Sequence, residues 1–252
     1  KQDKQASELK ARKTNKKLEL NSEFKKLKNL SNIDCWIFDL DNTLYPVSTN
    51  LFTQINVNMS KYIMDLLKVD RDVADKMRHD YWQEYGTSLA GLMKNFEIEP
   101  DHFLEFVHDI DFSVLSKDAD LLDVLKKLPG RKIVYTNGTA PYAKKVLEQI
   151  GIIHVFDEIY GIESANYIPK PSPEAYEIIF SKAKIVFNRS AMFEDEMRNL
   201  KVPYNLGLKT ILICDTPSKE NFVNYSTKNL VIFLQHFLST SLNETNKIYV
   251  ST

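Results

Sequence analysis

The chain has 252 residues, of which 43% are hydrophobic and 27% charged, and its formal net charge is −1. This balance is typical of a globular protein with one large domain, or with a core domain and a smaller one. No apolar run reaches the roughly 18 residues that a membrane helix needs, so we expect no membrane partner. The two cysteines and five histidines lack the spacing of a zinc site.

Charge is unevenly distributed along the chain. Residues 1–30 carry ten basic and four acidic side chains, whereas the remainder carries 23 basic and 30 acidic ones. A basic tail can contact nucleic acid or anionic lipid, but a solvated extension explains the composition more simply. We therefore interpret residues 1–31 as a lysine-rich N-terminal extension and expect no nucleic-acid partner. The polar start and the predicted free thiols of Cys35 and Cys214, each in a buried strand, favour a cytoplasmic protein.

The predicted elements begin with one strand, continue with helices only, and then alternate. A short apolar run predicts a buried strand over residues 33–39. Apolar residues then recur at three- and four-residue spacing, which predicts helices over 51–66, 72–85, 88–95 and 100–107. Farther along, strands are predicted over 132–136, 156–160, 191–194 and 209–214, and helices over 119–128, 141–150, 173–183 and 230–238.

Strands separated by helices favour a parallel sheet with helices on both faces. We therefore predict an α/β fold whose core comprises residues 32–48 and 113–240. Residues 49–112 form an all-helical insertion, which we interpret as a small cap positioned to cover the end of the first strand. Residues 241–252 are predicted to be a polar C-terminal tail.

Two aspartates, Asp39 and Asp41, follow the first predicted strand and are themselves followed by Asn42 and Thr43. A parallel strand delivers its functional groups at its carboxyl end. An acidic pair beside a buried strand is costly unless it serves a purpose. The simplest alternative is a polar turn that merely ends the strand. Three further polar stations downstream make that alternative weaker.

The second and third stations suit an anion. Thr136 ends the next strand, and its hydroxyl with the backbone N–H groups of Asn137 and Gly138 makes a small anion-binding nest. The Asn-Gly pair is also an ordinary turn, so this motif is weak alone. Lys170 lies between two prolines, and a stiff backbone reduces the entropy lost in directing its ammonium at a fixed anion.

The fourth station suits a cation. Glu194 and Asp195 follow an apolar strand, where adjacent acids are costly unless a cation holds them. Mg²⁺ prefers such hard oxygen ligands. A nucleophile, a proton donor and positive charge around the phosphate oxygens are what phosphoryl transfer requires. The four stations together therefore predict phosphate chemistry.

The segment DLDNTLYP over residues 39–46, with the later stations in this order, resembles the haloacid dehalogenase (HAD) superfamily and, within it, the pyrimidine 5′-nucleotidase-like branch. The resemblance implies a Rossmann-like core with an inserted helical cap, and a Mg²⁺-dependent phosphohydrolase. It also implies that Asp39 is the nucleophile that forms an aspartyl-phosphate and that Asp41 is the general acid–base residue. A hydrolytic dehalogenase would need neither Asp41 nor the Glu194–Asp195 pair, so phosphate chemistry is favoured.

The same resemblance implies the other site residues. Thr136 and Lys170 join Asp39 and Asp41 as the catalytic set, and the implied phosphate-binding residues are Thr136, Asn137, Gly138 and Lys170. The implied Mg²⁺ ligands are Asp39, the backbone carbonyl of Asp41, Asp195 and, directly or through water, Glu194. Asn199 matches a polar position that orients Lys170 or Asp195. Glu196 departs from the family pattern, which usually has a small residue at this position.

Residues 81–92 resemble the cap of the same branch, and the aromatic residues among them could stack on a base or could form the core of the cap. We predict a nucleoside 5′-monophosphate substrate with pyrimidine preference, contacted by Asn42, Tyr45, Tyr85 and Thr87. The alternatives are a broad small-metabolite or sugar-phosphate phosphatase, a phosphomutase, and a regulatory binding protein without turnover. The expected partner is a small phosphorylated metabolite, and the expected assembly is a monomer or weak dimer.

Overall fold

The computed structural model describes residues 27–249, with side chains described for residues 27–240. Most of the predicted N-terminal extension therefore lies outside the described residues. Within them, six strands form one parallel sheet in the order β3-β2-β1-β4-β5-β6. The strands are β1 (Cys35–Phe38), β2 (Arg131–Tyr135), β3 (Glu158–Tyr160), β4 (Ser190–Glu194), β5 (Lys209–Ile213) and β6 (Tyr225–Thr227).

The central strand β1 is buried on both faces, as its uninterrupted apolar sequence requires. Its side chains alternate between two hydrophobic clusters. Trp36 and Phe38 belong to the cluster on one face, where Phe38 stacks on Phe193 with ring centroids 4.8 Å apart. Cys35 and Ile37 belong to the cluster on the other face. This two-sided burial fixes the end of β1 at the centre of the molecule.

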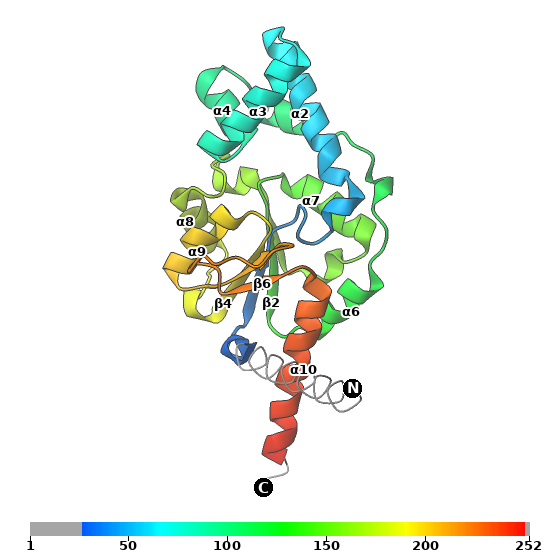
Figure 1. Cartoon of the computed structure of the whole chain (residues 1–252), viewed down its shortest axis with the longest axis vertical. Helices are drawn as coiled ribbons and strands as arrows, with labels where there is room; N and C mark the ends of the chain where they lie inside the picture. Colours follow the sequence, from blue (N-terminus) through cyan, green and yellow to red (C-terminus); the bar gives the residue numbers. More distant parts are fainter. Residues whose placement is uncertain (1–26, 250–252) are drawn as a thin grey trace, which may run out of the picture.

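Helices cover both faces of the sheet (Figure 1). One face is covered by α6 (Ala119–Lys127), α7 (Ala140–Ile150) and α10 (Leu230–Tyr249), and the other by α8 (Pro173–Lys182) and α9 (Lys201–Leu206). Short 3₁₀ turns connect the elements: η1 (Lys28–Leu30), η2 (Val47–Thr49), η3 (Phe112–Val114), η4 (Ile153–Val155), η5 (Ile162–Ala165), η6 (Phe187–Arg189) and η7 (Met197–Leu200). A parallel sheet with helices on both faces confirms the predicted α/β fold.

Four helices between β1 and α6 form a separate layer: α2 (Leu51–Leu67), α3 (Arg71–Tyr85), α4 (Ser88–Asn95) and α5 (Pro100–Val107). Figure 1 shows this cap above the carboxyl ends of the strands. Side-chain caps start two of these helices. Asp70 accepts a hydrogen bond from the Val73 N–H at 3.0 Å, and Thr87 accepts one from the Ala90 N–H at 3.1 Å.

The structure differs from the sequence-based prediction in four places, the first of which is helix α9, a short helix that was not predicted. Strand β6 was not predicted, because its sequence Tyr-Ser-Thr is short, polar and only half-buried at the sheet edge. Helix α10 continues to Tyr249 instead of ending at residue 238, so it includes most of the predicted polar tail. Cys214 lies just after β5 and is half-buried, whereas Cys35 is buried in β1 as expected. No helix in the described ranges is long and apolar enough to cross a membrane.

Candidate active site

The site lies where the strand order changes direction. From β1 the sheet continues to β2 on one side and to β4 on the other, and the carboxyl ends of β1 and β4 face a crevice at such a point. A cavity of about 430 Å³ opens there between the sheet and the cap. Its core side is lined by Asp39, Asp41, Asn42, Thr136, Asn137, Gly138, Lys170, Glu194, Asp195, Glu196, Arg198 and Asn199.

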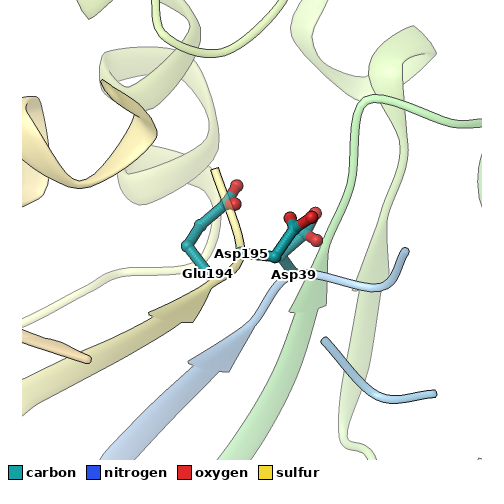
Figure 2. A group of neighbouring side chains, drawn as sticks. All are labelled: Asp39, Glu194 and Asp195. Atoms are coloured by element: carbon teal, nitrogen blue, oxygen red, sulfur yellow. The ribbon is translucent and has the colours of Figure 1, made fainter. Parts of the chain in front are cut away.

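A buried lysine joins two of the predicted stations. Lys170, which is 1% exposed, donates to Asp39 Oδ1 at 2.8 Å and to Glu194 Oε1 at 2.6 Å. A third hydrogen bond runs from its Nζ to the carbonyl of Tyr135 at 3.1 Å. Because all three donors of the ammonium are used, its position is fixed. Figure 2 shows the carboxylates of Asp39 and Glu194 projecting from the ends of neighbouring strands.

The backbone around Lys170 is also held. Asn137 Oδ1 accepts from the Lys170 N–H at 2.9 Å, and Asn137 Nδ2 donates to the Lys170 carbonyl at 3.1 Å. Asn199 Nδ2 donates to Glu194 Oε1 at 2.8 Å, so Asn199 reaches Lys170 through Glu194. The loop that carries Lys170 is therefore held by Asn137 directly and by Asn199 through Glu194.

The electrostatics of this cluster follow from its burial. Burial and the neighbouring Glu194 carboxylate raise the pKa of Asp39, while the Lys170 ammonium opposes them. Burial and the same carboxylate also raise the pKa of Asp195. The Asp39 and Glu194 carboxylates raise the pKa of Lys170 despite its burial, so the lysine stays charged. The cluster therefore holds more acid than its one lysine neutralises.

A divalent cation fits this excess of acid. Asp39, Glu194 and Asp195 each offer a carboxylate oxygen, and the three oxygens lie within 4.8 Å of one another. Both oxygens of Glu194 already accept hydrogen bonds, Oε1 from Lys170 and Asn199 and Oε2 from the Glu196 N–H at 2.9 Å. Among the described residues, Asp195 accepts only a long contact of 3.4 Å, from Asn42 Nδ2. Both oxygens of Asp39 accept hydrogen bonds as well, from Lys170 at 2.8 Å and from Thr43 Oγ1 at 3.3 Å. Asp195 is therefore the least engaged of the three carboxylates, which are the hard oxygen donors that Mg²⁺ prefers.

The carboxyl of Asp41 is held by two tyrosines. Its Oδ1 accepts from Tyr45 Oη at 2.5 Å and from Tyr142 Oη at 2.7 Å, whereas its Oδ2 has no hydrogen-bond partner among the described residues. Burial raises the pKa of Asp41, although both phenol hydrogen bonds lower it. The Tyr142 ring is itself stacked against His108 on the cap side, with ring centroids 4.2 Å apart. One oxygen is thus fixed and the other is left for a bound molecule.

The second station forms a compact turn. Thr136 Oγ1 accepts from the Gly138 N–H at 3.0 Å. A Cβ at Gly138 would lie 2.8 Å from the Tyr142 ring, so glycine lets this turn pack against α7. The Thr136 hydroxyl and the turn N–H groups line the cavity beside Lys170. Their placement suits an anion.

The cap meets the core close to Lys170. Arg198 donates to the carbonyls of Gln83 at 3.2 Å and Gly86 at 3.4 Å, at the C-terminus of α3. Its guanidinium lies 4.1 Å from the centre of the Trp82 ring. Gly86 has φ +92°, and a Cβ there would lie 2.9 Å from the Lys170 carbonyl. These contacts hold the end of α3 against the loop that carries Lys170.

The predicted substrate residues divide into two groups. Asn42 and Thr87 line the cavity. Tyr45 is buried beneath Asp41 and does not line it. Tyr85 also lies outside the lining, where it packs against Tyr81 with ring centroids 5.7 Å apart.

Sequence reasoning missed three residues that the structure places at the site. Tyr142 holds Asp41 from 101 residues away, and no local pattern links the two. Arg198 connects the fourth station to the cap. Arg78 lines the cavity from α3 and was not distinguished from the other charges of that helix. Of the three, only Arg198 had a signal in the sequence, because it follows the predicted metal ligand Asp195 by three residues.

Comparisons with known proteins agree with this geometry. The sequence model described as haloacid dehalogenase-like hydrolase matches residues 33–202. Phosphate metabolism protein 8 of Saccharomyces cerevisiae is 29% identical over 218 residues, which are 77% of this chain and 66%, slightly less than two thirds, of that protein.

Two solved structures share the fold. An HAD phosphatase from Thermococcus onnurineus has a TM-score of 0.57 at 16% identity, covering 82% of this chain and 98% of that one. A magnesium-bound putative HAD-hydrolase, YfnB from Bacillus subtilis, has a TM-score of 0.54 at 15% identity, with coverage of 82% and 98%. At these identities the likeness concerns the fold alone.

Proposed function

Because the chain belongs to the haloacid dehalogenase-like hydrolase family, we propose that it is a Mg²⁺-dependent phosphomonoesterase acting through an aspartyl-phosphate on Asp39. The observation that carries the proposal is the buried contact of Asp39 and Glu194 with Lys170, beside Asp195. Such a cluster combines a nucleophile with positive charge for the phosphate oxygens. It is assembled at the carboxyl ends of β1 and β4, where this fold binds ligands.

In the first step, the Asp39 carboxylate forms a bond to phosphorus while the bond from phosphorus to the ester oxygen breaks. Asp41, protonated, transfers its proton to the departing oxygen. The raised pKa of Asp41 favours this protonated form. The Lys170 ammonium, whose donors are used within the protein, would stabilise the phosphate oxygens through its charge. The backbone N–H of Asn137 would donate to the same oxygens, on which negative charge is spread.

In the second step, water adds to phosphorus and the bond to Asp39 breaks. Asp41 takes the proton of that water, so it returns to its starting state, and inorganic phosphate leaves. Asp39 and Asp195 would hold Mg²⁺, together with the Asp41 carbonyl, and Glu194 would hold Lys170. A bound ion would supply positive charge that offsets the phosphate charge and would lower the pKa of the carboxylates that hold it.

We propose nucleoside 5′-monophosphates, with pyrimidine preference, as substrates. The support is the likeness of residues 39–46 and 81–92 to the pyrimidine 5′-nucleotidase-like branch, and a 430 Å³ cavity within the usual range for small-molecule sites. A sugar-phosphate phosphatase uses the same catalytic residues and remains the principal alternative. The free thiols of Cys35 and Cys214 support a reducing compartment such as the cytoplasm.

A phosphate-release screen tests the activity and the substrate class together. The panel contains pyrimidine and purine nucleoside 5′-monophosphates, sugar phosphates and p-nitrophenyl phosphate, each with Mg²⁺ and with a chelator. We expect Mg²⁺-dependent release that is fastest with pyrimidine nucleotides. Release from sugar phosphates alone would contradict the substrate class, and absence of release from every ester would contradict the activity.

The variant Asp41→Asn tests the roles of the two aspartates. A nucleotide leaves as a poor alkoxide that needs a proton, so its turnover should fall by about 10² or more. A phenolate needs no proton, so p-nitrophenyl phosphate should give an early burst with Asp39 trapped as aspartyl-phosphate. Rapid-quench kinetics and intact mass would detect it. Equal losses on both substrates without added mass would show that Asp41 is not the acid–base residue.

The variant Asp195→Asn tests the metal site independently of turnover. Mg²⁺ that binds only the folded state raises its melting temperature. We expect Asp195→Asn to abolish most of this rise along with activity. An unchanged Mg²⁺ response would remove Asp195 from the ligands.

A further inference from the structure

The cap side of the cavity is mostly apolar. Helices α2 and α5 present a wall of aliphatic and aromatic side chains, formed by Phe52, Ile55, Met59, Phe103, Leu104 and Val107. Helix α3 and the turn after it supply the polar part, which includes Arg78. A molecule held here would place an apolar face against one wall and a polar edge toward α3.

Arg78 is the cationic side chain that α3 places in the cavity lining, and it is only partly paired. Its Nη1 donates to Asn56 Oδ1 at 2.9 Å, and its Nε is shielded from solvent without a partner. The Arg78 guanidinium makes no other hydrogen bond and no ion pair within the described part of the chain, whereas the Arg78 carbonyl accepts from Ser88 Oγ at 2.9 Å. Burial lowers the pKa of Arg78, and the Asp75 carboxylate only partly opposes this effect.

Asp75 raises the pKa of Arg78 but forms no ion pair with it among the described residues. Asp75, one turn earlier on α3, accepts from Arg71 Nε at 2.9 Å through its Oδ2, and its Oδ1 accepts from Ser60. Both oxygens of that carboxylate are therefore engaged. Asn56, in turn, fixes the guanidinium from α2. Arg78 is thus held in the cavity wall with donors to spare.

The aromatic residues of α3 are occupied by the protein itself. One neighbour of the Trp82 ring is the Arg198 guanidinium, 4.1 Å from its centre, and another is His79 at 5.5 Å. Tyr81 packs over Gly91, where a Cβ would overlap its ring. Trp82 and His79 line the cavity, but their rings already contact other side chains, which disfavours recognition of a base by stacking on them. The apolar wall and Arg78 remain for that purpose.

We propose that Arg78 selects the substrate by donating hydrogen bonds to a carbonyl oxygen of the nucleobase, whose faces lie against the apolar wall. This inference rests on the proposed nucleotide activity and adds the residue that sets base preference. A guanidinium only donates hydrogen bonds, so it can pair with the carbonyl oxygens of a base but not with its amino groups. Uracil carries two such oxygens, whereas adenine carries none. Cytosine carries one such oxygen, and so does guanine, so this contact would favour pyrimidine nucleotides over the adenosine nucleotide and not over every purine.

The variant Arg78→Met keeps the length of the stem and removes the donors. Uridine 5′-monophosphate, adenosine 5′-monophosphate and ribose 5-phosphate share the scissile group and differ in the base. We expect the ratio of kcat/KM for the uridine nucleotide to that for ribose 5-phosphate to fall by about 10- to 100-fold in Arg78→Met. The ratio of uridine to adenosine nucleotide should fall with it.

Lys76→Met is the matched control, because Lys76 is exposed on the same helix and lies outside the cavity lining. We expect it to leave both ratios unchanged. Arg78→Lys serves as a second variant if Arg78→Met does not fold. It keeps the charge and loses the planar fork, so the uridine to ribose 5-phosphate ratio should fall by about 3- to 10-fold.

The outcomes separate this inference from the proposed function. Wild-type hydrolysis of the uridine nucleotide with unchanged ratios in Arg78→Met and Arg78→Lys would overturn the role of Arg78 and leave the nucleotidase standing. Hydrolysis of ribose 5-phosphate without any nucleotide turnover would overturn the base contact and the substrate class, but not the phosphatase. If Arg78→Met lost activity only toward a sugar bisphosphate, Arg78 would bind a second phosphate and not a base, which would also overturn the proposal.

Discussion

The core side and the cap side of the cavity differ in how completely their polar groups are paired. On the core side, Lys170 donates hydrogen bonds to Asp39, Glu194 and a backbone carbonyl. Asp41 Oδ1 accepts hydrogen bonds from two tyrosine hydroxyls. On the cap side, an apolar wall adjoins Arg78, which has one partner. The core is therefore organised before any substrate arrives, which is how electrostatic catalysis works best.

The difference has a consequence for substitutions. Changes on the core side should reduce turnover of every phosphomonoester, because each such group serves the transferred phosphate. Changes on the cap side should alter the relative rates of different substrates. Residues between the two sides should show an intermediate pattern.

Lys170→Met should have the largest effect, because it removes the charge shared by two buried carboxylates. We expect activity on all esters to fall by more than about 10³-fold, and the free energy of unfolding to fall by about 3–5 kcal/mol without Mg²⁺. Steady-state kinetics and urea unfolding measure the two effects. Lys182→Met is the control, since Lys182 is exposed on α8. A substrate-dependent loss in Lys170→Met would contradict the assignment of this residue to the core side.

Tyr142→Phe removes one of the two hydroxyls that hold Asp41 and keeps the ring on which His108 stacks. We expect turnover of nucleotides to fall by about tenfold, and that of p-nitrophenyl phosphate by less than about threefold, because only the alkoxide needs the proton. Tyr204→Phe on α9 is the control. Equal losses on both esters would mean that the hydroxyl supports the fold and not the acid.

Gly86→Ala tests the contact between the two sides. The added Cβ would lie 2.9 Å from the Lys170 carbonyl, and the positive φ adds strain. We expect kcat/KM to fall by about fivefold and stability by about 1 kcal/mol. Gly207→Ala carries similar strain, with φ +102°, but its Cβ would meet nothing closer than 3.9 Å. If both variants lose the same activity, the cap contact at Gly86 does not matter for turnover.

The smallest effect concerns pH and the boundary residue His108. Burial, assisted by the nearby Lys145 charge, lowers the pKa of His108 from 6.5 to about 4. The unfolded chain therefore binds a proton near pH 6.5 that the folded chain refuses until about pH 4, so stability should fall as pH drops through this window. Because the ring keeps some exposure, we expect a loss of about 1 kcal/mol.

Thermal unfolding at pH 7 and pH 5 measures this loss. His108→Gln should reduce the difference between the two values, and His154→Gln, at an exposed position, should not. An unchanged pH dependence in His108→Gln would show that another group carries it.

The sequence by itself determined the fold and the four stations. An apolar run buried on both faces specifies β1, and polar residues directly after β1, β2 and β4 must meet at one edge because parallel strands end together. Helical periodicity likewise specified the cap, whose helices α3 to α5 begin within one residue of their predicted starts. Strand β6 was not predicted, because three polar residues at a sheet edge carry no such pattern.

Only the tertiary structure decided how these residues pair. The sequence placed Glu194 among the metal ligands, directly or through water, and folding keeps it in the acidic cluster with Asp39 and Asp195. Folding alone shows that its oxygens also accept from Lys170, Asn199 and a backbone N–H. The sequence placed Tyr45 and Tyr85 at the substrate, whereas one holds Asp41 and the other packs within the cap. Tyr142, Arg198 and Arg78 had no sequence signal of comparable strength. The physical reason is that strand ends and helix faces follow from local periodicity, whereas hydrogen-bond partners drawn from distant segments depend on how those segments pack together.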